Sequence, residues 1–179
     1  MYMTQTPEEL MTAFQNGDRD AMGQLYEQLV EPLYCFLFRY TGEKEISIDT
    51  VHDVFETLHK KKNQYDVNRG TVKAFVFQIA YRQLVNKLNR RRKWRSLLPS
   101  LVPRERTRVS TEDRLAVQKA LDTLSDPHRA VILLAYYEDM AQGDIAQILD
   151  IPVGTVKSRL HHAIQQLKSR LKEDFPHER

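Results

Sequence analysis

Two adjacent histidines, His161 and His162, are the residues of this sequence most suited to binding a metal ion. Neighbouring residues on a helix point about 100° apart, so these two imidazoles cannot chelate one ion together. Paired ligands on a helix need i, i+4 spacing, and the residue four positions after His161 is Gln165. The spacing therefore predicts no metal site, and no other motif predicts a cofactor.

The sequence also lacks the spacings that carry catalysis. No P-loop, GxSxG, HExxH or CxxC motif occurs, and Gly42, Gly70 and Gly143 are isolated. The pair Glu8 and Glu9 fits the first turn of a helix, where the helix dipole stabilises negative charge. A nucleic-acid-processing enzyme would need clustered metal-binding carboxylates or a nucleophile, so we predict that the protein is not an enzyme.

The segment DIPVGTVKSRLHHA, residues 150–163, is typical of a helix-turn-helix, in which the second helix enters the major groove of DNA. We predict a short helix at 142–149, a tight turn and a long helix over about 153–171. The first turns of the long helix hold several polar side chains: Thr155, Lys157, Ser158, Arg159 and His162. A helix N-terminus favours phosphate, and Arg159 can also reach guanine edges. The apolar positions alone would equally fit any pair of packed helices.

Gly154 opens the long helix with a residue that costs about 1 kcal/mol relative to alanine in a helix interior and less in a first turn. One interpretation is that no side chain can stand between this turn and the DNA backbone. The other is a packing requirement of the fold.

Charge is strongly segregated along the chain. Residues 1–60 hold 4 Lys/Arg and 11 Asp/Glu, residues 61–112 hold 14 and 3, and residues 113–179 hold 9 and 10. A basic band of this density predicts binding to phosphate, and an acidic flank predicts a basic partner.

Within the basic band, Arg82, Asn86 and Arg90 share one face of a predicted helix and could contact base edges or phosphates. Aromatic residues lie among these charges: Tyr65, Phe75, Phe77, Tyr81 and Trp94. Aromatic stacking suits unpaired bases, although a place in the core is the alternative for each ring. In the acidic flank, a predicted helix at 47–61 buries Ile48, Val51, Phe55 and Leu58 and turns an acidic face outward.

Apolar residues recur at helical spacing almost throughout the chain, which predicts an all-α fold. We expect two small helical domains, at 1–93 and 112–179, joined by an irregular linker at 94–111 that contains two prolines. In the second domain we expect four helices, of which the second runs to about residue 137. Thr6 and Thr71 are the expected N-caps of two helices in the first domain.

The single cysteine, Cys35, lies in an apolar run and predicts a buried thiol rather than a disulfide framework. No apolar stretch reaches about 18 residues, and the N-terminus is acidic. We therefore expect no membrane insertion, no signal peptide and a cytoplasmic location.

The chain from about residue 20 to 171 resembles a bacterial sigma factor of the extracytoplasmic-function (ECF) group, the members of the sigma-70 family that keep only regions 2 and 4. DIAQILDIPVGTVKSRLHHAIQQLK is close to the region 4 signature, and YDVNRGTVKAFVFQIAYRQLVNKLNRRRK is close to the end of region 2. The resemblance implies a protein that binds core RNA polymerase and promoter DNA and is regulated by an anti-sigma factor.

The resemblance also implies roles for single positions. The face that would dock on the β′ clamp helices of the polymerase consists of Asp49, His52, Asp53 and Glu56, and the β flap is the second expected polymerase contact. The residues that would read or capture the minus-10 element are Asn68, Arg69, Arg82, Asn86 and Arg90. Those that would meet the minus-35 element are Pro152, Gly154, Thr155, Lys157, Ser158, Arg159, His161 and His162. The linker at 97–107 would thread toward the RNA exit channel.

Four positions depart from the pattern of the family. His52 and Asp53 stand where Gln-Glu is usual, Phe75 stands for a frequent tryptophan, and His162 stands for arginine. These differences could tune polymerase affinity and promoter preference. The alternative function is a helix-turn-helix regulator that binds duplex DNA without polymerase.

Overall fold

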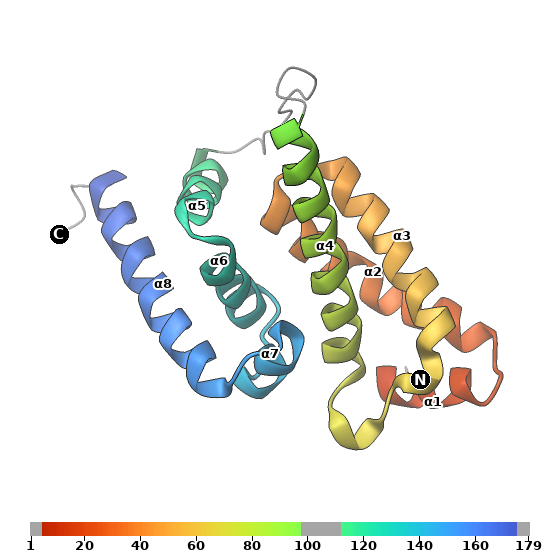
Figure 1. Ribbon diagram of the computed structural model, residues 1–179. Helices are drawn as coiled ribbons and strands as arrows, with labels where there is room; N and C mark the ends of the chain where they lie inside the picture. Colours follow the sequence, from red (N-terminus) through yellow and green to blue (C-terminus); the bar gives the residue numbers. More distant parts are fainter. Residues whose placement is uncertain (1–4, 98–111, 175–179) are drawn as a thin grey trace.

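The computed structural model describes residues 5–97 and 112–174 (Figure 1). Throughout these residues the secondary structure is helical, without a strand, so the predicted all-α fold is confirmed. No helix in the described part of the chain is long and apolar enough to cross a membrane.

The first four helices form one bundle: α1 (Pro7–Gln15), α2 (Asp20–Thr41), α3 (Lys44–Lys61) and α4 (Val72–Leu97). As predicted, Thr6 caps α1 in a capping box with Glu9, and Gly42 ends α2 in the left-handed conformation, with φ of 69°. The amide of Ala74 donates to Thr71 Oγ1 at 3.1 Å, which confirms Thr71 as the cap of α4. Two short 3₁₀ turns, Lys62–Gln64 and Val67–Arg69, connect α3 to α4.

The predicted core of α3 is wrong at one position. Val51, Phe55 and Leu58 are buried, but Ile48 is exposed, and Val54 is fully buried instead. The helix begins at Lys44 rather than near Ser47, and its buried face includes the small polar residues Ser47 and Thr50. Both hydroxyls donate to backbone oxygens four residues earlier, so they are satisfied inside the helix.

Helix α4 continues to Leu97, so the predicted loss of helical structure at residue 94 is wrong. The last turns lack an apolar stripe because they project into solvent, where Trp94 and Leu97 are 63% and 65% exposed. Arginine is a good helix former, and Arg91 and Arg92 pair with Glu43 and Asp126. The predicted linker beyond Leu97 falls outside the described residues.

The second group consists of α5 (Glu112–Thr123), α6 (Asp126–Ile132), α7 (Gln142–Leu149) and α8 (Val153–Asp174). The predicted second helix of this group does end at Tyr137, but its last five residues, Leu133–Tyr137, are π-helical rather than α-helical. Asp150 ends α7 with φ of 55° and starts the tight turn to α8. Ile145, Ile148 and Val156 are fully buried between the helices, as a helix-turn-helix requires.

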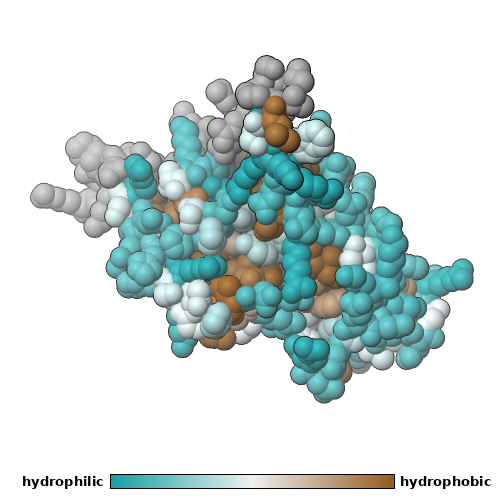
Figure 2. All heavy atoms as spheres, viewed as in Figure 1, coloured by the Kyte–Doolittle hydropathy of each residue, from teal (hydrophilic) through white to brown (hydrophobic). Residues whose placement is uncertain are grey.

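The two groups of helices pack against each other, with α4 next to α7 (Figure 1). Arg129 on α6 is 9% exposed and donates to the backbone oxygen of Tyr40 on α2 at 2.9 Å. Lys73 Nζ on α4 lies 3.2 Å from the buried Glu138 carboxylate. Viewed from the same side, the surface is largely hydrophilic, and hydrophobic residues show through near the middle (Figure 2).

Candidate nucleic-acid and polymerase interfaces

The acidic face of α3 lies on the surface of the first bundle. Asp49, His52 and Glu56 are exposed, and Glu56 pairs with Lys60 one turn later in the same helix. Asp53 is half-buried, and its Oδ2 lies 2.7 Å from Lys87 Nζ on α4. Asp53 therefore also links α3 to α4 through an ion pair. Asp49, His52 and Glu56 on the same face are accessible to a partner.

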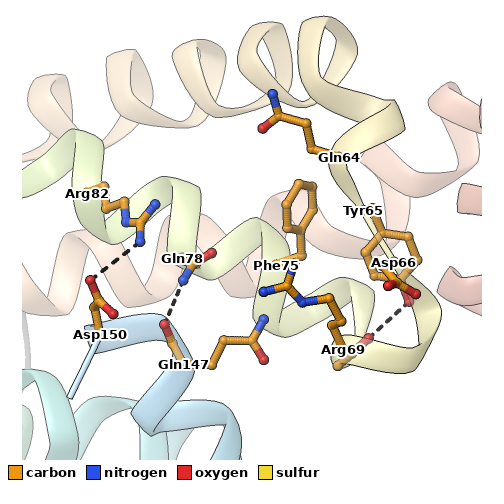
Figure 3. A pocket seen from close by; sticks show the side chains of 10 residues that line it. Gln64, Tyr65, Asp66, Arg69, Phe75, Gln78, Arg82, Gln147 and Asp150 are labelled. Carbon is orange, nitrogen blue, oxygen red and sulfur yellow. Dashed lines mark hydrogen bonds and ion pairs between the residues drawn. The ribbon is translucent and has the colours of Figure 1, made fainter.

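The loop before α4 forms one side of a pocket of about 500 Å³ (Figure 3). Asp66 Oδ1 accepts hydrogen bonds from the amide and side chain of Asn68, at 2.9 and 3.1 Å. Tyr65 donates from its hydroxyl to the backbone oxygen of Gly70 at 3.2 Å. Gly70 has φ of 142°, a conformation that a residue with a Cβ rarely adopts, so glycine is required to shape this loop.

The pocket brings charged and aromatic groups together. Its lining residues are Gln64, Tyr65, Asp66, Arg69, Gly70, Phe75, Gln78, Arg82, Gln147 and Asp150. Two of the predicted minus-10 residues, Arg69 and Arg82, are therefore neighbours in one pocket. Asn68 lies on the same loop outside the lining, and Asn86 and Arg90 are exposed farther along α4.

The aromatic side chains divide between core and surface. Phe77 is fully buried and Tyr65 is 7% exposed, and the Tyr65 ring packs against Phe75 with centroids 5.6 Å apart. Burial raises the pKa of the Tyr65 hydroxyl, so this group stays protonated and acts as a hydrogen-bond donor. Tyr81 packs edge-on against Tyr40, with centroids 6.3 Å apart, and of the five rings predicted to lie among the basic residues Trp94 is the largely exposed one. Phe75 and Tyr65 are thus the rings that line the pocket.

The start of α8 is open to solvent. Pro152, Gly154, Lys157 and Ser158 are exposed, whereas Thr155 and Arg159 are half-buried. A Cβ on Gly154 would meet no atom within 4 Å, so packing does not require glycine there. Of the two interpretations of Gly154, the open space therefore favours room for the DNA backbone over a packing requirement.

The two histidines of α8 make separate local hydrogen bonds. His162 Nδ1 donates to the backbone oxygen of Ser158 at 2.8 Å, and His161 Nε2 lies 3.0 Å from Gln165 Nε2. Across the described ranges 5–97 and 112–174, no group of three or more metal-binding side chains occurs. Both imidazoles are exposed on the same helix as Lys157 and Ser158.

Sequence reasoning did not predict several residues that shape these surfaces. The ring of His128 on α6 lies 6.4 Å from that of His162, and Gln147 and Asp150 on the C-terminal helices reach the pocket of the first bundle. Their roles depend on contacts between segments about 35 to 80 residues apart, and no local pattern reports such contacts. For this region, the sequence indicated the tight turn at Asp150 but not its contact with the first bundle.

This arrangement defines a class of protein: an all-helical DNA-binding factor with a helix-turn-helix, a basic helix beside an aromatic pocket, and a separate acidic surface on α3. The family model for Sigma-70 region 2 matches residues 25–95, and the model for Sigma-70, region 4, matches residues 114–167. The first range covers most of α2 together with α3 and most of α4, and the second runs from α5 into α8.

The chain is similar to two curated proteins over most of its length. It is 32% identical to the ECF RNA polymerase sigma factor SigL of Mycobacterium tuberculosis, over 85% of this chain and 89% of that protein. It is 24% identical to SigW of Bacillus subtilis, over 88% and 92%. The chain therefore belongs to the ECF RNA polymerase sigma factors, which are transcription initiation factors rather than regulators that act without polymerase.

Two solved structures share the fold. The sigma factor RpoE of Bartonella quintana, in complex with the anti-sigma factor NepR, aligns with a TM-score of 0.76 at 21% identity, over 84% of this chain and 96% of that one. CnrH, in complex with the cytosolic domain of CnrY, aligns with a TM-score of 0.72 at 23% identity, over 92% and 96%. The likeness confirms the predicted all-α architecture.

Proposed function

We propose that this sigma factor binds core RNA polymerase through α3, reads the minus-35 element with α8 and captures the minus-10 element with α4 and the loop before it. The observation that carries the proposal is the presence of three chemically different surfaces on one chain. An acidic helix face suits a basic protein surface, a pocket with rings and arginines suits an unpaired base, and a helix-turn-helix suits duplex DNA.

The docking assignment is supported by the exposure of Asp49, His52 and Glu56. Three exposed polar side chains at positions 49, 52 and 56 stand on one side of α3, because residues three and four apart share a helix face. We assign the β′ clamp helices as the partner of this face and the β flap as the partner of the C-terminal helices.

The minus-10 assignment rests on the pocket. Phe75 and Tyr65 offer ring surface for an unstacked base, and Gln78 and Asp66 offer polar groups for its edge. Arg69 and Arg82 supply positive charge for the adjoining phosphates, with Asn68, Asn86 and Arg90 extending the contact along the loop and α4. Melting is then driven by capture of the separated strand, without hydrolysis of a nucleotide.

The minus-35 assignment rests on the open N-terminal turn of α8. Pro152 and Gly154 leave room for the DNA backbone, and Lys157 and Ser158 are exposed beside them. Thr155, Arg159, His161 and His162 complete the predicted contact surface. His162 offers a neutral or singly charged ring where the family has arginine, so one contact to the duplex differs from that of its relatives.

Two further features of the proposal concern the whole chain. Solved relatives of the same fold are titled as a sigma factor with an anti-sigma factor and as CnrH with the cytosolic domain of CnrY, so we propose an anti-sigma partner for this protein too. We keep the division into two domains, with the first extended to the end of α4 at Leu97 and the second at 112–179, and we propose that the linker between them enters the polymerase. Polymerase and promoter are in the cytoplasm, and we propose the same location for the protein, which needs no enzymatic activity of its own.

In vitro transcription with purified core polymerase and a library of promoter fragments tests this function. We expect transcripts that start downstream of one shared pair of minus-35 and minus-10 sequences and that depend on adding the protein. The same transcript set with core polymerase alone would contradict the proposal.

A further inference from the structure

One wall of the pocket beside α4 does not belong to the first bundle. Gln147 on α7 and Asp150 after it line the pocket together with Arg69, Phe75 and Arg82 (Figure 3). These two residues belong to the helix-turn-helix that is assigned to duplex DNA, so the two DNA-reading parts of the chain meet at this pocket.

Gln147 makes the closest approach to the loop. Its Oε1 lies 2.6 Å from the point where a Cβ on Gly70 would stand, so a side chain at position 70 would displace the end of Gln147 from this place. Its backbone oxygen accepts a hydrogen bond from Gln78 Nε2 at 2.7 Å. A carboxamide carries one acceptor and two donors, the same kinds of group that the edge of an adenine or cytosine presents.

Asp150 supplies negative charge at the other end of the pocket. Its Oδ2 lies 3.8 Å from Arg82 Nη2, and the two side chains are 85% and 59% exposed. An anionic oxygen opposite Arg82 is what a nucleic-acid phosphate would also provide. The carboxylate and the amide together therefore present an anion and a polar edge to a pocket suited to a nucleotide.

We propose that Gln147 and Asp150 act as an intramolecular ligand of this pocket and contact its polar groups, Gln78 and Arg82, in place of an unstacked base and its phosphate. The inference rests on the proposed function, because it takes the pocket to be the site of minus-10 capture. The melted strand and the helix-turn-helix then compete for Arg82 and Gln78, and a chain in this conformation cannot hold a promoter strand.

The strength of these contacts allows such competition. An ion pair between exposed side chains contributes little in water, so a nucleotide with several contacts can displace Asp150. The contact between the two groups of helices is reinforced elsewhere, by Lys73 with Glu138 and by Arg129 with Tyr40. The pocket itself is thus the weak part of a longer interface.

Binding of a fluorescent single-stranded oligonucleotide, which carries the minus-10 sequence found in the transcription experiment, tests the inference. The full chain without polymerase is compared with the double variant Gln147→Ala and Asp150→Asn. Asparagine tolerates the left-handed conformation at 150 and alanine is a good helix former at 147, so neither change disturbs the fold. We expect the variant to bind the oligonucleotide about tenfold more tightly, because the Gln147 carboxamide and the Asp150 carboxylate no longer compete with it, while the hydrogen bond from Gln78 to the backbone oxygen of residue 147 is kept.

Gln142→Ala is the matched control, because Gln142 is exposed on the same helix and does not line the pocket. It should leave the affinity unchanged. Adding Arg82→Gln to the double variant should remove the gain. Equal affinities for the wild-type chain and the double variant would overturn the inference, provided that the holoenzyme binds the same oligonucleotide. Absence of binding by the holoenzyme would instead overturn the minus-10 assignment itself.

Discussion

The acidic face of α3 and the pocket beside α4 lie on the same helical bundle, but they differ in what covers them. Asp49, His52 and Glu56 face solvent, whereas the pocket carries two residues of the helix-turn-helix. On the proposed assignments, polymerase can dock on this conformation without rearrangement, whereas a promoter strand must first displace Gln147 and Asp150 from Gln78 and Arg82. The difference predicts an order of events, in which polymerase binds first and the two groups of helices separate before the strand is captured.

The largest expected effect is on the open face. Asp49→Lys reverses a charge at an exposed position, so the fold should be unaffected, but attraction to a basic docking surface turns into repulsion. We expect association with core polymerase to fall at least about tenfold, measured by co-purification and by competition for core. Asp53→Lys is a less clean change, because it also removes the ion pair with Lys87.

Glu31→Lys is the control for charge, since Glu31 is exposed on α2 and not on the predicted face of α3. If Asp49→Lys and Glu31→Lys lowered polymerase binding equally, a general charge effect would replace the docking assignment.

The next effect tests the interface that holds the two groups of helices together. Arg129 is almost fully buried and donates to backbone oxygens of Leu121, Leu124 and Tyr40 at 3.0, 3.2 and 2.9 Å. Arg129→Ala leaves these buried acceptors unsatisfied, and we expect a loss of about 3 kcal/mol in the free energy of unfolding. Chemical denaturation measures it, and Arg90→Ala on the exposed face of α4 should change stability by less than about 0.5 kcal/mol. Similar stabilities for the two variants would show that Arg129 is not needed to join the groups.

A smaller effect separates base reading from phosphate contact on α8. Arg159→Ala should weaken binding of the holoenzyme to the minus-35 element by about 1 to 3 kcal/mol. The measurement compares the selected sequence with a scrambled one. An equal loss on both duplexes would reduce Arg159 to a phosphate contact.

On α4, a substitution of Asn86 distinguishes capture of the minus-10 strand from binding of duplex DNA. Asn86 is exposed on α4 and lies outside the pocket, so Asn86→Ala leaves the interface with α7 intact. We expect normal duplex binding and a several-fold slower formation of the open complex, because the variant cannot make a hydrogen bond to the strand that is worth about 1 kcal/mol. Normal permanganate reactivity of the minus-10 thymines would refute the assignment of Asn86.

The smallest effect concerns pH. Burial raises the pKa of Glu138, although Lys73 beside it opposes the shift. A carboxyl with a raised pKa in the packed state favours that state when protonated, so this contribution is lost as pH rises from the ordinary carboxyl range through the raised pKa. Glu138→Gln should flatten the pH dependence of the melting temperature in this window, and Lys73 can still donate to the backbone oxygen at 138. A profile identical to that of the wild type would rule out Glu138 as its source.

Local patterns in the sequence predicted most of the fold. The capping box at Thr6, the stop at Gly42 and the turn at Asp150 depend on a few neighbouring residues, and each was found where expected. Ile48 and the end of α4 were predicted wrongly because both depend on what packs nearby. An apolar residue at helical spacing is buried only if another element covers it, and a helix without an apolar stripe can persist in solvent when ion pairs hold it.

The sequence predicted which residues are exposed on the surfaces, but not which distant segments come into contact there. The open turn at Gly154 and the exposed Asp49 agree with the expectations from charge and spacing. The approach of Gln147 to Gly70, and the burial of Arg129, depend on how two distant segments meet, so no periodicity could predict them. The assignment of single residues to promoter elements stays a prediction.

The distance between the two groups of helices tests the account most directly. Dyes placed at positions 31 and 168, which are exposed on α2 and α8, report this distance by energy transfer once Cys35 is replaced by serine. We predict one population of high transfer for the free chain and a shift to low transfer in the holoenzyme bound to a melted promoter. Low transfer in the free chain, unchanged by polymerase and DNA, would contradict the account.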